Sequence, residues 1–286
     1  MNSVTVEELY KTAKQRLQEA GIDSPAFDAL CIIEKVFGFD RTALIARGDT
    51  KADDKSAQLF CSLVERRCSF EPLQYILGSW SFMGCDFAVG KGVLIPREDT
   101  CEVVNLCIES AGPNAKLEIL DLCSGSGAIA VVLAKAFKNS NVTAVELSPR
   151  AFEYLEKNIK SNGVSVKAMQ KDIFTCFDDF SDNSFDIIVS NPPYVISDEI
   201  KTLQKEVRME PSMALDGGED GLDFYRFITS QWTKKLKCGG VMAFELGENQ
   251  FDDVRQMMLA QGLENIKFKV DLGGTQRAII GTLLKK

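Results

Sequence analysis

Short apolar runs of strand length alternate with stretches of helical periodicity from Pro113 to the end of the chain, and this alternation limits the possible folds more than any other feature. Such alternation predicts an α/β fold, in which helices cover both faces of a mainly parallel sheet. The expected strands lie at 117–122, 142–147, 165–169, 187–189, 240–246, 266–270 and 277–284, and the expected helices lie at 128–137, 149–159, 222–236 and 251–261.

The last two of these seven expected strands are separated only by residues 271–276. This connection is too short for the crossover that parallel strands require, so the two strands should pair antiparallel. We therefore expect a seven-stranded, Rossmann-like sheet that ends in a reversed hairpin.

The first 75 residues carry helical patterns and no strand signal. Thr5 and Glu8 have the spacing of a capping box, and Ser24 followed by Pro25 is typical of a helix start. The expected helices lie at 6–20, 25–37, 41–46 and 53–68. Residues 1–75 should therefore form a small helical bundle, which either is purely structural or docks a partner.

The pattern of the sequence changes after this bundle. Residues 76–91 alternate in polarity and contain aromatic residues and glycines, which predicts a β-hairpin linker. The chain should thus divide into a helical domain at 1–75, this linker at 76–91, and the α/β domain at 92–286.

The segment Asn191-Pro192-Pro193-Tyr194 directly follows the apolar run 185–189, which has the character of a buried strand. Proline has no backbone N–H and restricts the residue before it, so the strand ladder cannot continue through this segment. The segment is expected to be a rigid lip at the carboxyl end of its strand. Ligands of open α/β sheets bind in the crevice outside these strand ends.

The lip has the groups needed to hold a planar nitrogen. The Asn191 side-chain oxygen and the Pro192 carbonyl oxygen can each accept one N–H of an NH₂ group, and Tyr194 can pack against its plane. Holding such a nitrogen in line with a methyl donor removes orientational entropy from the reaction. We therefore expect Asn191, Pro192 and Tyr194 to be catalytic.

A glycine-rich loop follows the first strand of the α/β domain. It runs from Asp121 through Cys123, Ser124, Gly125, Ser126 and Gly127 into a helix, and is expected to bind a cofactor. The same spacing fits a nicotinamide dinucleotide, which remains an alternative. However, the Asp121 carboxylate would repel a pyrophosphate, whereas it can pair with the ammonium of a methionine moiety. S-adenosylmethionine therefore fits this loop better.

Two further acidic residues stand at strand ends. Glu146 closes the second strand, where a carboxylate can accept hydrogen bonds from ribose hydroxyls, although either cofactor would use it. Asp172 and Ile173 follow the third strand, where an adenine would find an acceptor for its amine and an apolar wall. All three residues are expected to bind the cofactor.

The composition excludes several function classes. The chain has no histidine and no Cys-x-x-Cys pair, which argues against a zinc site and against serine or cysteine hydrolase chemistry; we expect no metal. The net charge of −8 disfavours binding to long nucleic acids. The absence of a signal peptide pattern and of a long apolar run predicts a cytoplasmic protein without membrane contact.

Four stretches together resemble the HemK/PrmC family, whose members are N5-glutamine methyltransferases of class I peptide chain release factors. The resemblance covers essentially the whole chain, including the helical domain and the hairpin. The stretches are 93–97, 121–127, 191–194 and 210–223. The expected sheet, with its reversed last hairpin, is also the usual arrangement of class I methyltransferases, although a fold supports a function only by analogy.

The resemblance implies that the methyl acceptor is the glutamine of the release factor's Gly-Gly-Gln motif. It also implies that S-adenosylmethionine is the donor, that S-adenosylhomocysteine is the product, and that the helical domain helps to dock the release factor. Asn191 would contact both the cofactor and the substrate. The other residues implied in substrate binding are Pro192, Pro193, Tyr194, Pro96, Arg97 and Thr100.

The chain departs from the family pattern at Cys123, where glycine is usual, and at Glu98, Cys101 and Gln276. Two related methylation reactions remain alternatives: methylation of a ribosomal-protein glutamine, and methylation of adenine N6 in nucleic acid. A nicotinamide oxidoreductase or an inactive nucleotide-binding module is the alternative from another class.

Overall fold

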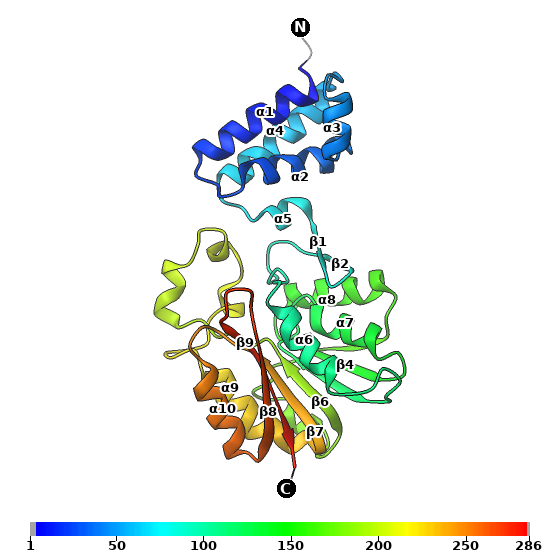
Figure 1. Cartoon of the computed structure of the whole chain (residues 1–286), viewed down its shortest axis with the longest axis vertical. Helices are drawn as coiled ribbons and strands as arrows, with labels where there is room; N and C mark the ends of the chain where they lie inside the picture. Colours follow the sequence, from blue (N-terminus) through cyan, green and yellow to red (C-terminus); the bar gives the residue numbers. More distant parts are fainter. Residues whose placement is uncertain (1–3, 285–286) are drawn as a thin grey trace. The chain divides into compact units, whose positions relative to one another are not determined.

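The computed structural model describes residues 4–284 and divides the chain into two compact units (Figure 1). One unit runs to Ser79 and also includes the segment Gln204–Met209. The other unit comprises Trp80–Leu203 and the chain from Glu210 onward. The segment Gln204–Met209 is thus a part of the helical unit that no sequence pattern predicted.

The helical unit is built from five helices among the described residues. They are α1 (Val6–Glu19), α2 (Pro25–Phe37), α3 (Arg41–Arg47), α4 (Asp54–Cys68) and α5 (Leu73–Leu77). The capping box of Thr5 and Glu8 is present, and Gly38 ends α2 in the left-handed conformation with a φ of 68°. The apolar faces of these helices meet in one core, in which Leu17, Ile32 and Ile33 are fully buried.

The segment Gln204–Met209 is held to this unit by charged contacts. The buried guanidinium of Arg67 donates to Asp28 at 2.6 Å and to Glu206 at 2.9 Å. The ammonium of Lys205 lies 3.9 Å from the centre of the Phe70 ring. Because Arg67 would otherwise be a buried and incompletely paired cation, Glu206 contributes to the interior of the helical unit.

The hairpin consists of β1 (Ser79–Phe82) and β2 (Cys85–Ala88). Its turn residues, Met83 and Gly84, both have positive φ, as the tightest hairpin turns require. The buried side-chain amide of Asn158 on α8 (Pro149–Asn162) donates to the carbonyl of Ala88 at 3.1 Å and to that of Ser126 at 2.9 Å. Asn158 therefore ties the end of the hairpin to the glycine-rich loop.

The α/β unit contains a seven-stranded sheet of order β5-β4-β3-β6-β7-β9-β8. Among the described strands β9 alone is reversed: it pairs antiparallel with β7 and with β8, and the short final connection predicted the second of these pairings. The strands are β3 (Glu118–Leu122), β4 (Asn141–Glu146), β5 (Val166–Gln170), β6 (Phe185–Ser190), β7 (Leu236–Glu245), β8 (Leu263–Val270) and β9 (Gln276–Leu283).

Helices cover both faces of this sheet (Figure 1). On one face α6 (Thr100–Glu109) contacts α7 (Ala128–Ala136), which in turn contacts α8. On the other face α9 (Asp223–Phe227) packs with α10 (Phe251–Ala260). The expected α/β fold is therefore confirmed, and the crevice between β3 and β6, where the chain turns to opposite sides, is the place where such sheets bind ligands.

The helix expected at 222–236 is broken. After α9 the chain forms a π-helical turn at Ile228–Trp232 and a 3₁₀ turn at Thr233–Lys235, and β7 then begins at Leu236. The Thr229 and Thr233 hydroxyls each donate to the carbonyl four residues earlier, at 2.7 Å, a contact that bends helices. These hydroxyl contacts cannot be predicted from the periodicity of the apolar residues, which indicated one continuous helix.

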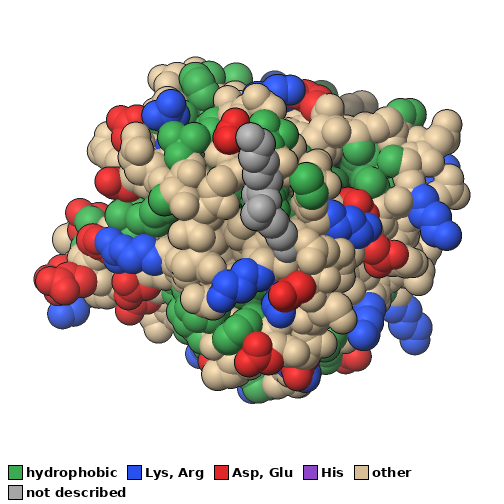
Figure 2. All heavy atoms as spheres, turned by 90° about the horizontal axis from the view of Figure 1, so that it is seen from below, with side chains coloured by type: hydrophobic (Ala, Val, Ile, Leu, Met, Phe, Trp, Pro, Cys, Tyr) green, Lys and Arg blue, Asp and Glu red, His purple; other side chains and the backbone are tan. Residues whose placement is uncertain are grey.

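The surface of the protein is mixed in charge on the face that Figure 2 shows, where basic and acidic side chains are interspersed. No helix within residues 4–284 has the length and apolar character needed to cross a membrane.

Candidate active site

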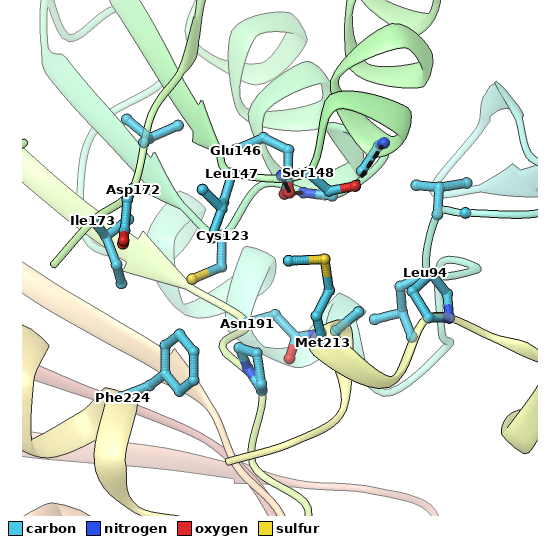
Figure 3. A pocket seen from close by; sticks show the side chains of 18 of the residues that line it. Leu94, Cys123, Glu146, Leu147, Ser148, Asp172, Ile173, Asn191, Met213 and Phe224 are labelled. Carbon is cyan, nitrogen blue, oxygen red and sulfur yellow. Dashed lines mark hydrogen bonds between the residues drawn. The ribbon is translucent and has the colours of Figure 1, made fainter. Parts of the chain in front are cut away.

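Two adjoining cavities lie at the carboxyl ends of the central strands, and Figure 3 shows the larger of them. The larger is bordered by residues that follow β3, β4, β5 and β6, and the smaller by residues 94–97, Thr100 and the glycine-rich loop. Leu94, Cys123, Gly125 and Asn191 line both cavities. A molecule in one cavity would therefore meet a molecule in the other at these residues.

The glycine-rich loop has the backbone that its sequence predicted. Cys123, Gly125 and Gly127 have φ values of 59°, 54° and 82°. A Cβ on Gly127 would lie 2.5 Å from Cδ1 of Leu155 on α8, so only glycine permits this close packing. To the larger cavity the loop thus presents Gly125 and the Cys123 side chain.

Asp121 lies behind this loop. Its side chain is fully buried and lines neither cavity, and one carboxylate oxygen accepts the N–H of Ala130 at 3.2 Å. The other oxygen, Oδ1, has no hydrogen-bond partner among the described residues, and burial raises the pKa of Asp121 to about 8. A buried oxygen of this kind suits a cationic or water partner, so the pairing of Asp121 with a methionine ammonium stays a prediction.

Glu146 ends β4 at the wall of the larger cavity. Its two oxygens accept the N–H groups of Gly125, at 2.8 Å, and of Ser148, at 2.7 Å. Burial raises the pKa of Glu146. Each carboxylate oxygen can accept a second hydrogen bond, so the side chain is oriented by the backbone and can still receive two hydroxyls.

The far end of the larger cavity is flat and apolar. Asp172 lies at its edge and accepts the N–H of Phe174 at 2.9 Å, while Ile173 forms part of the wall. Phe224, on α9, faces Ile173 across this end of the cavity (Figure 3). The Phe174 and Phe224 rings pack edge to face, with centroids 5.1 Å apart. This end has the shape and polarity suited to a heteroaromatic ring.

The lip leaves β6 as expected, and Asn191 and Pro193 line the larger cavity. Asn191 donates its side-chain N–H to the Thr100 hydroxyl at 3.4 Å. Pro192 and Tyr194 are not among the lining residues of either cavity. Burial raises the pKa of the Tyr194 phenol, which therefore stays protonated.

Glycines of the stretch 217–221 support the lip from behind. A Cβ on Gly217 would lie 2.7 Å from the Tyr194 Cα, and one on Gly221 would lie 2.4 Å from the Tyr194 carbonyl oxygen. The side-chain amide of Gln250 donates to that same carbonyl at 2.9 Å. Gly217 and Gly221 of the motif at 210–223 thus pack their backbone closely against the lip, where a side chain has no room.

The smaller cavity holds the residues implied at the substrate mouth. Pro96, Arg97 and Thr100 line it together with Ser124, Ser126 and Asn191. Glu210 fixes this segment, because its carboxylate accepts the N–H of Ile95 at 2.9 Å and pairs with the Arg97 guanidinium. The site residues predicted from sequence are therefore brought together, except that Asp121, Gly127, Pro192 and Tyr194 lie outside the cavity linings.

Sequence reasoning missed several residues of the site. Met213 and Phe224 line the larger cavity, but neither stands at the end of a strand, where the sequence analysis placed the site residues. Glu245 and Gln250 contact Tyr194 through its hydroxyl and its carbonyl. A signal was present for Glu245, which is an acidic residue at the end of an otherwise apolar strand.

Comparisons with known proteins agree with this geometry. Residues 8–78 match the PrmC N-terminal domain, and residues 104–218 match the methyltransferase small domain. A release factor glutamine methyltransferase of Geobacter sulfurreducens is 36% identical over 280 residues, which cover 98% of this chain and 97% of that protein. One of Fusobacterium nucleatum is 35% identical over 96% of this chain and 77% of its own length.

The chain belongs to the release factor glutamine methyltransferase family. A solved methyltransferase structure from Pyrococcus furiosus has the same fold, with a TM-score of 0.53 at 20% identity, and covers 72% of this chain and 92% of that one. Both the family and this fold agree with the resemblance drawn from the sequence.

The four residues that depart from the family pattern lie in different parts of the α/β unit. Cys123 adopts the left-handed φ that explains the usual glycine, and its sulfur points into the cavity (Figure 3). Burial raises the pKa of the Cys123 thiol, so it is not a ready nucleophile. Glu98 is exposed, and Cys101 is half-buried on the first turn of α6. Gln276 begins β9.

Proposed function

We propose that this enzyme transfers a methyl group from S-adenosylmethionine to the side-chain amide nitrogen, N5, of the glutamine in the Gly-Gly-Gln motif of class I peptide chain release factors. S-adenosylhomocysteine is then the second product, and the reaction supports translation termination in the cytoplasm. The observation that carries the proposal is Asn191, which lines both cavities at the end of β6. The family to which the chain belongs supports the choice of acceptor.

S-adenosylmethionine, when bound, supplies an electrophilic methyl group on a sulfonium. Glu146 would hold the ribose, because its oxygens are already oriented by the N–H groups of Gly125 and Ser148. Asp172, Ile173 and Phe224 would enclose the adenine. The Oδ1 atom of Asp121 lies behind the loop and has no partner among the described residues. The ammonium of the methionine moiety, or a bridging water, would donate a hydrogen bond to it.

The lip would orient the glutamine. Asn191 and the Pro192 carbonyl would each accept one N–H of the amide, and the Tyr194 ring would pack against its plane. An amide nitrogen is a weak nucleophile because its lone pair is delocalised. The two acceptors stabilise the positive charge that develops on this nitrogen as its bond to the methyl carbon forms, and one amide proton leaves afterward. Alignment of the reacting atoms removes orientational entropy worth ~7–11 kcal/mol in well-ordered cases.

The helical unit would dock the release factor, and the segment 94–97 with Thr100 would contact the peptide near Asn191. A nucleic-acid substrate is not favoured, because the net charge of the chain is −8.

Methyl transfer from labelled S-adenosylmethionine tests the proposal. Purified release factor with its Gly-Gly-Gln motif should be labelled, whereas a Gly-Gly-Ala version should not. DNA, RNA and ribosomal protein are included as separate samples. Label on nucleic acid or on ribosomal protein alone would overturn the proposed substrate.

The variant Asn191→Ala serves as the mechanistic control. It should abolish transfer to the release factor while binding of S-adenosylmethionine falls only in part, because Glu146 and Asp172 remain. Isothermal calorimetry measures the second quantity. Near-normal turnover by Asn191→Ala would contradict the role given to the amide.

A further inference from the structure

Met213 borders the larger cavity on its solvent side. It lies in the 3₁₀ turn Ser212–Ala214 and lines the cavity, yet 49% of the residue is exposed. In Figure 3 its side chain points into the cavity, and its sulfur lies on the side toward Glu146 and Ser148. Met213 thus stands at the boundary between the cavity and solvent, and the proposed mechanism gives it no role.

The turn that carries Met213 is anchored on both sides. Before the turn, the Glu210 carboxylate accepts the N–H of Ile95 at 2.9 Å. After the turn, the carbonyl oxygen of Leu215 accepts the N–H of Val195, the residue that follows the lip, at 2.8 Å. Met213 is therefore held between the lip and the segment that borders the smaller cavity.

The backbone of the turn is stabilised by its own hydrogen bonds. The Ala214 N–H donates to the Pro211 carbonyl, and the Leu215 N–H donates to the Ser212 carbonyl, both at 2.9 Å. These bonds do not involve the Met213 side chain, so its truncation should leave the turn in place. The identity of residue 213 should therefore affect the cavity more than the fold.

Met213 shares its exposure with two other apolar residues of the larger cavity. Phe174 is 37% exposed and Leu147 is 47% exposed, and both line this cavity. A molecule that fills the cavity must contact these side chains and remove part of their surface from water, which favours binding. An apolar lining with a few oriented polar groups, such as Glu146, is typical of sites for small molecules.

Methionine is suited to cover a molecule in such a cavity. Its side chain is unbranched and flexible, and its polarisable sulfur fills irregular gaps. Glu146 lies on the opposite side, where its oxygens are oriented by backbone N–H groups and can accept hydroxyls. A molecule between the two residues would have a polar contact on one side and an apolar contact on the other.

We propose that Met213 is a cofactor-binding residue, whose side chain covers the solvent-facing side of bound S-adenosylmethionine opposite Glu146. This inference rests on the proposed function and adds to it. The cover removes apolar surface of both partners from water, so it raises the affinity for the cofactor. S-adenosylhomocysteine lacks only the transferred methyl group, so Met213 raises its affinity by a similar factor.

Oxidation by hydrogen peroxide tests this contact in the wild-type enzyme. The Met213 sulfur gains one oxygen atom and becomes a sulfoxide, while the peroxide is reduced to water. An exposed thioether reacts faster than a covered one. We therefore expect saturating S-adenosylmethionine, without release factor, to slow the oxidation of Met213 at least about fivefold, and S-adenosylhomocysteine to protect it similarly.

Met209 is an internal control for this experiment. It is 45% exposed and lines neither cavity, so the cofactor should not change its rate of oxidation. Trypsin cleaves after Arg208 and Arg226, which places both methionines in one peptide of residues 209–226. Mass spectrometry of the fragments of this peptide measures both extents of oxidation in the same sample.

Substitutions of Met213 test its effect on affinity. Met213→Ala should raise the Kd for S-adenosylmethionine about tenfold, because much of the apolar contact is lost. Met213→Leu keeps the volume and should stay within about threefold of wild type. In both variants kcat at saturating cofactor should stay within about threefold of wild type, since the lip is unchanged. Met209→Ala is the matched control and should bind the cofactor as wild type does.

The outcomes separate this inference from the proposed function. Cofactor binding that leaves Met213 unprotected, or wild-type affinity in Met213→Ala, would overturn the role of Met213. Protection that requires the release factor would place Met213 at the substrate and would overturn it as well. Protection by the cofactor in an enzyme that methylates no release factor would support the contact and overturn the proposed reaction.

Discussion

The Gln250 side chain donates to the Tyr194 carbonyl oxygen at 2.9 Å and to the Gly221 carbonyl oxygen at 3.2 Å, and its own oxygen accepts the N–H of Gly247 at 3.0 Å. One amide thus joins the lip, the glycine-rich stretch behind it and the segment after β7. Gln250, the residue before α10, therefore holds the lip in place in addition to the two prolines.

Replacing Gln250 with alanine should destabilise the protein by about 1–3 kcal/mol, because three backbone groups near the lip lose their partner. Urea denaturation measures the change in the free energy of unfolding. Gln261→Ala, just after α10, is the matched control and should change stability little. Equal stability of Gln250→Ala and wild type would show that water replaces the amide.

Glu146→Ala should raise the Kd for S-adenosylmethionine about 10–100-fold, the effect expected when hydrogen bonds to a charged group are lost. Calorimetric titration gives the affinity. Glu153→Ala, on the exposed side of α8, removes the same charge and should bind as wild type does. An unchanged affinity in Glu146→Ala would show that the ribose does not bind at the end of β4.

Gly127→Ala should destabilise the fold by at least ~1 kcal/mol, because its φ of 82° disfavours a side chain and the new Cβ would meet Leu155. Gly112→Ala is the control, since a Cβ there meets nothing within 4 Å. The two thermal unfolding midpoints should therefore differ clearly. If they coincide, the loop does not need the close packing on α8.

Asp121 should make stability depend on pH. Its pKa is raised from 3.8 to about 8, so the folded protein binds more protons than the unfolded chain between these values. Its contribution is therefore complete below about pH 4 and is lost as pH rises through about 8. The stability difference between Asp121→Asn and wild type should grow in favour of the variant over this interval. A constant difference would show that Asp121 has an ordinary pKa.

Much of the fold could be predicted because local signals agreed with the tertiary structure. The cap at Thr5, the stop at Gly38 and the strand–helix alternation each correspond to an observed element. The reversed final strand followed from the length of one connection. These features depend on residues that are close to each other in the sequence, so a sequence pattern can predict them.

The features that could not be predicted from the sequence depend on contacts between residues that are far apart in the chain. Glu206 belongs to the helical unit because Arg67 and Asp28 lie there, and Glu245 belongs to the active site because β7 pairs with β6. At the break after α9 two threonine hydroxyls bond the carbonyl four residues earlier, and the apolar periodicity does not predict these bonds. Phe224 and Met213 reach the cavity only through the folded connections that carry them.

The segment Gln204–Met209 also determines how the protein can be divided. The chain crosses between the two units after Ser79, again before Gln204, and a third time after Met209. A fragment cut at the hairpin would therefore lose Glu206 and leave the Arg67 guanidinium one carboxylate short. Proteolysis at the hairpin alone would make the helices a separate polypeptide, which would be held to the remainder by noncovalent contacts such as those of Gln204–Met209 with Arg67 and Phe70.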